Sequence, residues 1–359
     1  MRVLVTGHRG YIGSPLVDRI KAAGHEVVGV DTELYEDCTF GGNKDSEIAT
    51  INQDIRELSP SDLDGIDGIA HLAGVCNDPL GDLLPDTTYD INYAATVRLA
   101  QIAKASGVRR FVFSSSCSVY GAAGQEWIDE QSQPNPITPY GLSKWKAEVD
   151  LRKLADARFS PVFLRSATAY GFSPRIRFDL VLNNLTAHAF TSGKVLLKSD
   201  GMSWRPIVHI EDIGRAFVAA LEAPVETVHN EIFNVGITTE NYRIREIAQI
   251  VEETVPGSRV EFAAGAGPDK RTYRVDCSKI SRLLPKFRPQ WTARRGAREL
   301  YQRYNEYGLL LEDFEGARYQ RLAYLQSLMA RGAVDVNLRW VVQVANLETG
   351  AYTLPPNPC

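Results

Sequence analysis

Three side chains in the first half of the chain have the types and the spacing of a proton-transfer site. Tyr140 and Lys144 stand four residues apart in a segment of helical periodicity, so their side chains share one face of a helix. Ser116 stands at the end of an apolar, strand-like run. A lysine ammonium beside a phenol favours the phenolate, and a serine hydroxyl would hydrogen-bond the substrate oxygen whose proton moves. Because a tyrosine and a lysine at this spacing are common on solvated helices, the pattern needs further support.

That support comes from a glycine-rich turn near the start of the chain. The apolar run 3–5 reads as a strand and 15–23 as a helix, and between them lie Gly7, Gly10 and Gly13. Such glycines let the backbone bend and let a pyrophosphate approach the main chain at a helix N-terminus. A second strand at 27–30 ends in Asp31, where an acid would bind a ribose 2′-hydroxyl. The sequence therefore predicts a dinucleotide site.

Strands and helices alternate through the segments that must position these groups. The expected strands continue at 69–72, 110–114 and 161–165, and the expected helices lie at 89–106 and 140–157. This alternation indicates parallel strands with helices on both faces. We therefore predict an α/β fold: a Rossmann-type doubly wound parallel sheet with a smaller interwoven α/β substrate domain.

The length of 359 residues suits two intimately packed domains. We expect the dinucleotide-binding domain over 1–165, with 207–238 returning to it. The substrate-binding domain is expected from 166–206 and 239–300. Residues 301–359 are expected to form a helical C-terminal extension and tail, which could close a cleft, extend a dimer interface or simply cover apolar surface. The packing role is the interpretation that we favour.

Composition narrows the classes of partner and the compartment. The formal net charge of -4 favours neither nucleic acid nor an anionic membrane surface. The five cysteines lack metal-ligand spacing, so we expect no metal and free thiols in a reducing cytoplasm. A strand is expected directly at the start, without a signal peptide, and no apolar run reaches the roughly eighteen residues of a spanning helix.

Taken together, these motifs resemble the extended short-chain dehydrogenase/reductase family, specifically its nucleotide-sugar epimerases and dehydratases. The resemblance runs in family order over 1–300 and is carried by 6–13, Asp31, Asp54, Ile55, 71–74, Asn92, 114–116, 140–144, 205–212 and 271–276. It implies a bound NAD, a catalytic triad of Tyr140, Lys144 and Ser116, and a nucleotide-diphosphate sugar held by the second domain.

The resemblance also implies which residues bind NAD. Asp31 would hold the adenosine ribose, and its carboxylate would repel the 2′-phosphate of NADP, although the spelling of the glycine turn also occurs in relatives that use NADP. Asn92 is expected to be structural or to lie on the cofactor side. The implied set is Gly7, Arg9, Gly10, Tyr11, Ile12, Gly13, Asp31, Asp54, Ile55, Leu72, Ala73, Gly74, Asn92, Ser114, Tyr140 and Lys144.

For the substrate, the resemblance implies contacts from Ser116, Cys117, Ser118, Thr168, Arg205 and Arg271. The two arginines would face the diphosphate, a role suited to a guanidinium, unless they form surface ion pairs. Thr168 stands where the family often has asparagine. Cys117 and Ser118 replace the two acids of the 4,6-dehydratases, and a neutral thiol is a poor acid for a departing hydroxyl, which disfavours that reaction. Cys117 is either a catalytic acid/base or a small buried hydrophobe.

The function expected from the sequence is an NAD-dependent nucleotide-sugar epimerase that acts at C4 through a transient 4-keto sugar. The alternatives are an NAD(P)H-dependent 4-ketosugar reductase, a dehydratase or epimerase at another carbon that uses Cys117, and a non-catalytic dinucleotide-binding regulator. The resemblance implies a homodimer through the helices near 90–106 and 140–157, where the sequence offers apolar positions at Val97, Leu99, Ile102, Val149, Leu151 and Leu154.

Overall fold

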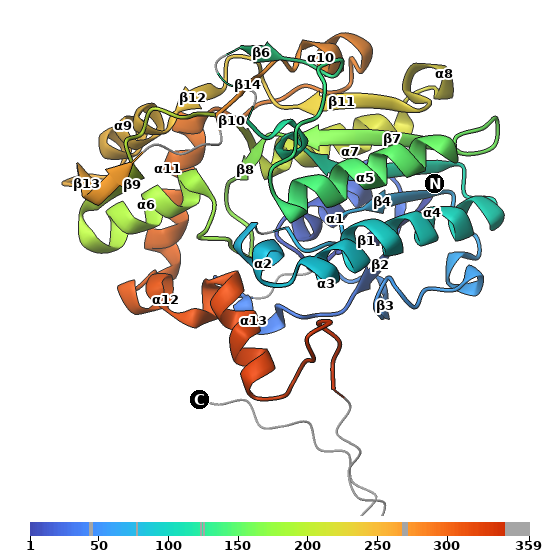
Figure 1. Ribbon diagram of the computed structural model, residues 1–359, viewed down its shortest axis with the longest axis horizontal. Coiled ribbons are helices and arrows are strands. Elements are labelled where there is room, and N and C mark those ends of the chain that lie inside the picture. The colour runs from blue at the N-terminus through green and yellow to red at the C-terminus, as the bar shows by residue number, and fades with distance from the viewer. Residues whose placement is uncertain (43–45, 77, 123, 125, 268–271, 342–359) are drawn as a thin grey trace, which may run out of the picture.

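A seven-stranded parallel sheet forms the centre of the computed structural model, which describes residues 1–42, 46–76, 78–122, 124, 126–267 and 272–341 (Figure 1). The strand order is β11-β7-β5-β4-β1-β2-β3, and every neighbouring pair is parallel. The Rossmann-type α/β fold is therefore confirmed. The strands are β1 (Arg2–Thr6), β2 (Glu26–Asp31), β3 (Ala49–Asn52), β4 (Gly68–His71), β5 (Arg110–Ser116), β7 (Ser160–Ser166) and β11 (Glu231–Val235).

Helices cover both faces of this sheet, because its central strands are apolar on both sides. Successive side chains of a strand alternate between faces, so Val3 and Val5 pack on one side and Leu4 on the other. The first side is covered by α1 (Gly13–Ala22) and α7 (Ile210–Glu222), and the second by α4 (Ala95–Ala105) and α5 (Pro139–Lys153). Because β1, β4 and β5 are parallel, the glycine turn after β1 and Ser116 at the end of β5 lie at the same, carboxyl end of the sheet.

The helix expected over 89–106 is not one regular helix. It consists of α3 (Pro85–Tyr89), a π-helical turn (Asp90–Ala94) and α4. The helix expected over 140–157 ends earlier, at Lys153, because Asp156 Oδ1 accepts hydrogen bonds from the N–H groups of Arg158 and Phe159 and forms a turn into β7.

The remaining elements build a smaller unit beside the carboxyl ends of the strands. The strand β10 (Trp204–His209) pairs there with β8 (Thr168–Tyr170) and β12 (Asn241–Arg243), whereas α7 and β11, which follow it, pack on and join the large sheet. The other strands are β9 (Lys194–Ser199), β13 (Arg259–Gly267), β6 (Trp127–Ile128) and β14 (Arg274–Val275). The other helices are α2 (Asp78–Leu83), α6 (Val181–Ser192), α8 (Val225–Val228), α9 (Ile244–Thr254), α10 (Ser278–Leu283) and α11 (Ala293–Tyr307).

The C-terminal extension continues from α11 as α12 (Leu311–Glu315), a 3₁₀ turn (Ala317–Tyr319) and α13 (Arg321–Ala330). Beyond α13 the chain turns back, and Val334 forms an isolated antiparallel bridge with Trp340. In Figure 1 this red segment approaches the edge of the large sheet that carries β2 and β3.

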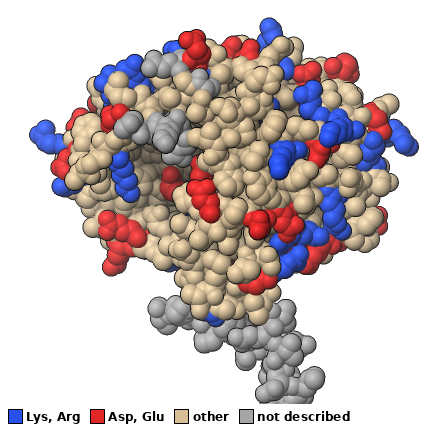
Figure 2. Space-filling view, in the orientation of Figure 1, with Lys and Arg blue, Asp and Glu red and all other residues tan. Residues whose placement is uncertain are grey.

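Two features of the surface and the helices relate to charge and hydropathy. Acidic and basic side chains are interspersed on the face shown in Figure 2. Within the described residues, no helix is both long and apolar enough to cross a membrane.

Candidate active site

The glycine turn between β1 and α1 is too tight for side chains at two of its positions. A Cβ added to Gly13 would lie 2.0 Å from the carbonyl oxygen of Gly7. Gly7 itself has a φ of +72°, and a Cβ there would lie 2.8 Å from the backbone nitrogen of Ala73. The turn therefore brings bare backbone and the N-terminus of α1 to the cavity wall, which is the environment that a diphosphate requires.

Asp31 lies beside this turn with its carboxylate held in place. One carboxylate oxygen accepts a hydrogen bond from the N–H of Arg9 and the other from the N–H of Glu33, each at 2.9 Å. The side chains of Arg9 and Glu33 form an ion pair with each other. The turn and this acid at the end of β2 thus fit the diphosphate and a ribose of NAD, respectively.

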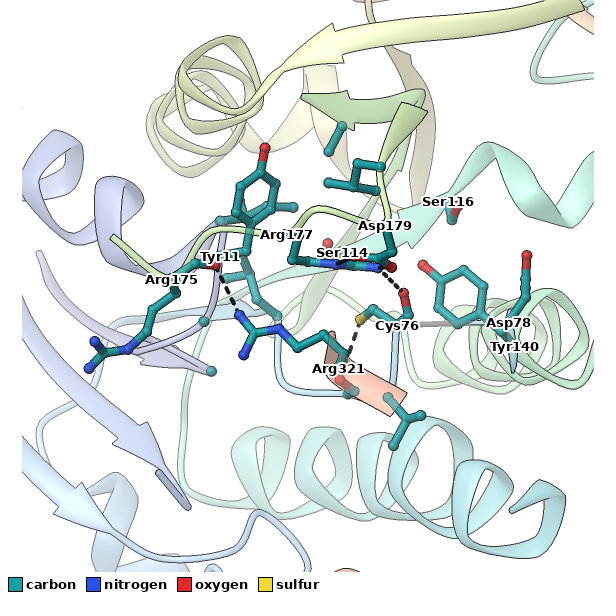
Figure 3. A pocket seen from close by; sticks show the side chains of 18 of the residues that line it. Tyr11, Cys76, Asp78, Ser114, Ser116, Tyr140, Arg175, Arg177, Asp179 and Arg321 are labelled. Atoms are coloured by element: carbon teal, nitrogen blue, oxygen red, sulfur yellow. Dashed lines mark hydrogen bonds and ion pairs between the residues drawn. The ribbon is translucent and has the colours of Figure 1, made fainter. Parts of the chain in front are cut away.

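A second group of side chains, Tyr140, Lys144 and Ser116, borders the same cavity as the glycine turn. Tyr140 lies in the first turn of α5, which Thr138 caps by accepting a hydrogen bond from the N–H of Gly141 at 3.1 Å. One turn later, Lys144 Nζ donates to the carbonyl oxygen of Ser114 at 2.8 Å and lies 6.0 Å from the centre of the Tyr140 ring. In Figure 3 the hydroxyl of Tyr140 points toward Ser116.

Burial dominates the electrostatics of this group. Burial raises the pKa of Tyr140, Cys76 raises it further, and the hydrogen bond with Ser116 lowers it. Burial also lowers the pKa of Lys144. Both shifts favour uncharged side chains, so forming the phenolate requires additional positive charge in the cavity.

Asn92 lies behind the cavity and braces it. The side chain is fully buried on the π-helical turn, where Oδ1 accepts from the N–H of Val75 at 2.7 Å. Its Nδ2 donates to the carbonyl oxygen of Val75 at 2.8 Å and to Ser143 Oγ at 3.2 Å. Asn92 thereby ties the loop after β4 to α5, a positioning role for the triad.

One cavity of about 960 Å³ contains the glycine turn, Asp31 and the triad. Apart from Asn92, every residue expected to bind NAD borders it: Gly7, Arg9, Gly10, Tyr11, Ile12, Gly13, Asp31, Asp54, Ile55, Leu72, Ala73, Gly74, Ser114, Tyr140 and Lys144. Asp54 is also held by Arg56, whose Nη2 donates to it at 2.6 Å. Burial would raise the pKa of Asp54, but the hydrogen bonds from Arg56 outweigh that effect and lower it.

The residues expected to bind substrate are only partly brought together. Ser116, Ser118, Thr168 and Arg205 border the cavity. Arg271 lies outside the described residues.

The structure corrects the expectation that Cys117 lines the substrate pocket. Its side chain is 1% exposed, packs with Val119 and Tyr120, and donates to the carbonyl oxygen of Arg165 at 3.2 Å. Burial also raises the pKa of the thiol. Ser116 and Ser118 face the cavity, but Cys117 between them points into a separate apolar cluster, so it is a small buried hydrophobe.

Several cavity residues escaped the sequence analysis. They are Cys76 from the loop after β4, Asp78 at the start of α2, Arg175, Arg177 and Asp179 from the loop after β8, and Arg321 and Leu338 from the C-terminal extension. Arg177 is the central one of these: Nη2 donates to the carbonyl oxygen of Cys76 at 2.9 Å and lies 2.6 Å from Asp179 (Figure 3). The alternation of charged residues with the buried Ile176 and Phe178 was the available signal.

Comparisons with known proteins agree with this geometry. Residues 3–236 match the model of the NAD dependent epimerase/dehydratase family. The UDP-glucose 4-epimerase of Bacillus subtilis (strain 168) is 29% identical over 328 residues, covering 84% of this chain and 94% of its own. UDP-glucuronic acid decarboxylase 4 of Arabidopsis thaliana is 28% identical over 297 residues, covering 79% of this chain and 64% of its own.

Among solved structures, MoeE5 in complex with UDP-glucuronic acid and NAD superposes with a TM-score of 0.74 at 28% identity. The match covers 85% of this chain and 99% of MoeE5. Part of this chain therefore has no counterpart in that structure.

Proposed function

Since this chain belongs to the NAD dependent epimerase/dehydratase family, we propose that it is a nucleotide-sugar epimerase that inverts C4 through a transient 4-keto sugar. NAD is its cofactor. The observation that carries the proposal is a single cavity with Tyr140, Lys144 and Ser116 at one end and the glycine turn with Asp31 at the other.

Tyr140 is the proton acceptor and donor in this proposal. As phenolate it takes the proton of the 4-hydroxyl, and as phenol it returns a proton to the same oxygen. Ser116 hydrogen-bonds that oxygen and keeps it beside the tyrosine. Bound NAD supplies the hydride acceptor and a positive charge that favours the phenolate. Lys144, held by the carbonyl of Ser114, adds the second positive charge.

The substrate side of the cavity supports a sugar nucleotide. Arg205 comes from β10, borders the cavity and is 8% exposed, so it would bind the diphosphate with little competition from water. Ser118 and Thr168 would contact the sugar. The nucleotide-sugar activities in the names of the relatives support this substrate class.

Two observations favour epimerisation over 4,6-dehydration. Ser116 is followed by Cys117 and Ser118, so no carboxylic acid follows the triad hydroxyl, and Cys117 turns away from the cavity.

The test is NMR of a panel of UDP-, dTDP-, GDP- and CDP-sugars incubated with the purified protein. We expect the C4 epimer of one of them, without net formation or consumption of NADH. Loss of water or carbon dioxide, or stoichiometric use of NAD(P)H, would contradict the proposal. The matched control is Tyr140→Phe, which should form the epimer more slowly by a factor on the order of 10²–10⁴.

We also propose a homodimer through the surface of α4 and α5. Leu99 and Leu151 are fully buried within the chain's own core, so they do not contribute. Ile102 and Leu154 are partly buried against the core, and Val97 is partly exposed on α4. Val149, 40% exposed on α5, is the most exposed of the expected apolar residues. Light scattering at micromolar concentration should give twice the chain mass, and Val149→Glu should lower it. A monomer mass for the unaltered protein would remove the idea.

A further inference from the structure

The C-terminal extension returns to the cofactor cavity. Residues 334–341, here named the C-terminal strap, lie across the loops that follow β2 and β3 (Figure 1). Trp340 Nε1 donates to the carbonyl oxygen of Thr32 at 2.7 Å. Arg56 Nη2 donates to the carbonyl oxygen of Asn337 at 2.9 Å. Arg339 forms an ion pair with Glu57. The strap is therefore bound both to the loop after β2, next to Asp31, and to the loop after β3, next to Ile55.

Leu338 is the residue of the strap that borders the cavity. The residue is 3% exposed and borders the cavity together with Thr32 and Ile55. Its φ is +57°, a conformation that is unfavourable for a branched side chain. Asp335 Oδ1 holds this turn by accepting from the N–H groups of Asn337 and Arg339 at 2.8 and 2.9 Å. Such a conformation persists only where the surroundings enforce it, and it is concentrated at ligand sites.

Arg321 provides an independent indication of a ligand. It begins α13, is 5% exposed and borders the cavity. Its guanidinium carbon lies 4.0 Å from the centre of the Tyr35 ring, and Nη2 donates to the carbonyl oxygen of Arg175 at 2.9 Å. Nη1 is buried and has no hydrogen-bond partner among the described residues. A buried cationic donor with an unmade hydrogen bond at a cavity wall requires an anionic partner.

We propose that the C-terminal extension is part of the cofactor site, with Leu338 packed against the adenosine of NAD and Arg321 donating to one of its phosphates. The placement follows from contacts close to Leu338 in the chain: Trp340 binds Thr32 and Asn337 binds Arg56. Arg321 lies on the ring of Tyr35, four residues after Asp31. The inference rests on the NAD-binding part of the proposed function and is independent of which sugar carbon reacts.

The strap has a consequence for turnover. An epimerase needs the reduced cofactor to remain bound until the hydride returns to the sugar. A wall that must open before adenosine leaves slows dissociation without changing the contacts at the nicotinamide end. We therefore expect the strap to act on cofactor release.

The test is Leu338→Gly in the full-length protein. Glycine adopts a positive φ freely, so the substitution removes the side chain without imposing a new backbone conformation. We expect the rate of NAD release to increase on the order of tenfold or more, as the loss of a buried leucine contact predicts. The rate is measured by diluting the NAD-loaded protein into an excess of an NAD-consuming trap. Because Leu338 also packs in the chain's own core, the melting temperature of the cofactor-free variant should fall, so release is measured at a temperature at which the variant remains folded.

Two further variants keep the test decisive if Leu338→Gly disturbs the fold. Trp340→Phe removes only the donor to Thr32. Arg321→Gln retains a donor for the carbonyl of Arg175 while removing the charge, and it should weaken NAD binding on the order of tenfold. The matched control is Leu310→Ala, because Leu310 is 54% exposed in the same extension and does not border the cavity.

Release rates within twofold of the unaltered protein for both Leu338→Gly and Arg321→Gln would overturn the inference. Normal NAD retention with no C4 epimer in the NMR panel would instead contradict the proposed reaction and leave the inference standing. The two failures are therefore distinguishable.

Discussion

The two walls of the cavity are built in different ways. The cofactor wall is centred on the backbone of one turn, between Gly7 and Gly13, and on the carboxylate of Asp31. The substrate wall consists of side chains from separated loops, such as Arg177 and Arg205, and Arg177 is already paired with Asp179 at 2.6 Å. Backbone geometry therefore defines the cofactor wall, whereas networks between distant side chains define the substrate wall. Substitutions that separate cofactor binding from turnover test this division.

The largest effect is expected from Tyr140→Phe. Removing the phenol oxygen deletes the proton acceptor but leaves the glycine turn and Asp31 unchanged. Turnover should fall by a factor on the order of 10²–10⁴, while calorimetry should find NAD binding nearly unchanged. Turnover at the unaltered rate would show that the catalytic role assigned to Tyr140 is wrong.

Lys144→Met should affect both walls, because Lys144 lies between Ser114 and the ring of Tyr140. Loss of the ammonium raises the pKa of Tyr140, so the phenolate forms at higher pH and the rate profile moves to alkaline pH. Ser116→Ala removes a hydrogen bond but no charge, so its profile should keep its position even though the rate falls. Identical profiles for both variants would contradict the electrostatic role of Lys144.

Asp31→Asn should change the cofactor wall alone. The carboxylate repels the 2′-phosphate of NADP and favours the free 2′-hydroxyl of NAD. Neutralising it should reduce the preference for NAD on the order of tenfold, measured by calorimetry on cofactor-free protein. Turnover with saturating NAD should change little. Tighter binding of NADP than of NAD by the unaltered protein would refute the assignment.

The smallest expected effect concerns the support behind the cofactor wall. His71 is fully buried between the hydroxyl oxygens of Thr6 at 2.7 Å and Thr96 at 2.8 Å. Burial, with a smaller contribution from Lys144, lowers the pKa of His71 from 6.5 to about 3. The unfolded chain therefore binds the proton more readily, so stability is present above the ordinary pKa and is lost as the pH falls toward the folded value.

The slope from this one histidine reaches about 1.4 kcal/mol per pH unit. Urea unfolding between about pH 7 and about pH 5 should show a flatter pH dependence for His71→Gln than for the unaltered chain. The difference between the two slopes isolates His71 from other titrating groups. Parallel slopes would mean that the imidazole is not held neutral.

The same division explains what the sequence could predict. The buried strands can be predicted from the sequence because strands covered on both faces of a parallel sheet are apolar runs, such as 110–114. The glycine turn is readable because its geometry depends on neighbours in sequence. The edge strand β3 was not predicted because Ala49–Asn52 is short, alternates apolar and polar residues over only four positions and is mostly exposed. A strand of this kind lacks the apolar signal on which the prediction depends.

The substrate wall and the contacts of the C-terminal extension could not be predicted from the sequence, and the reason differs from that for β3. Arg177 matters because the loop after β8 brings it to Cys76, about a hundred residues earlier in the chain. Leu338 borders the same cavity as Thr32 and Ile55 only because the chain returns after α13. The alternation around Arg177 does not identify Cys76 as its partner, and the position of Leu338 leaves no periodic pattern in the sequence. The packing role expected for 301–359 thus omitted the two side chains that reach the cavity, Arg321 and Leu338.

The π-helical turn at Asp90–Ala94 has a consequence for how this fold tolerates insertions and deletions. Such a turn adds one residue to an α-helix, which rotates everything beyond it by about 100°. Here Asn92 faces Val75 while Leu99 still faces the sheet. Deleting one residue from the turn would restore a regular helix, but either the Asn92 bridge or the Leu99 packing would then lose its register. Length changes in this segment should therefore be among the rarest that an evolving lineage of this chain accepts.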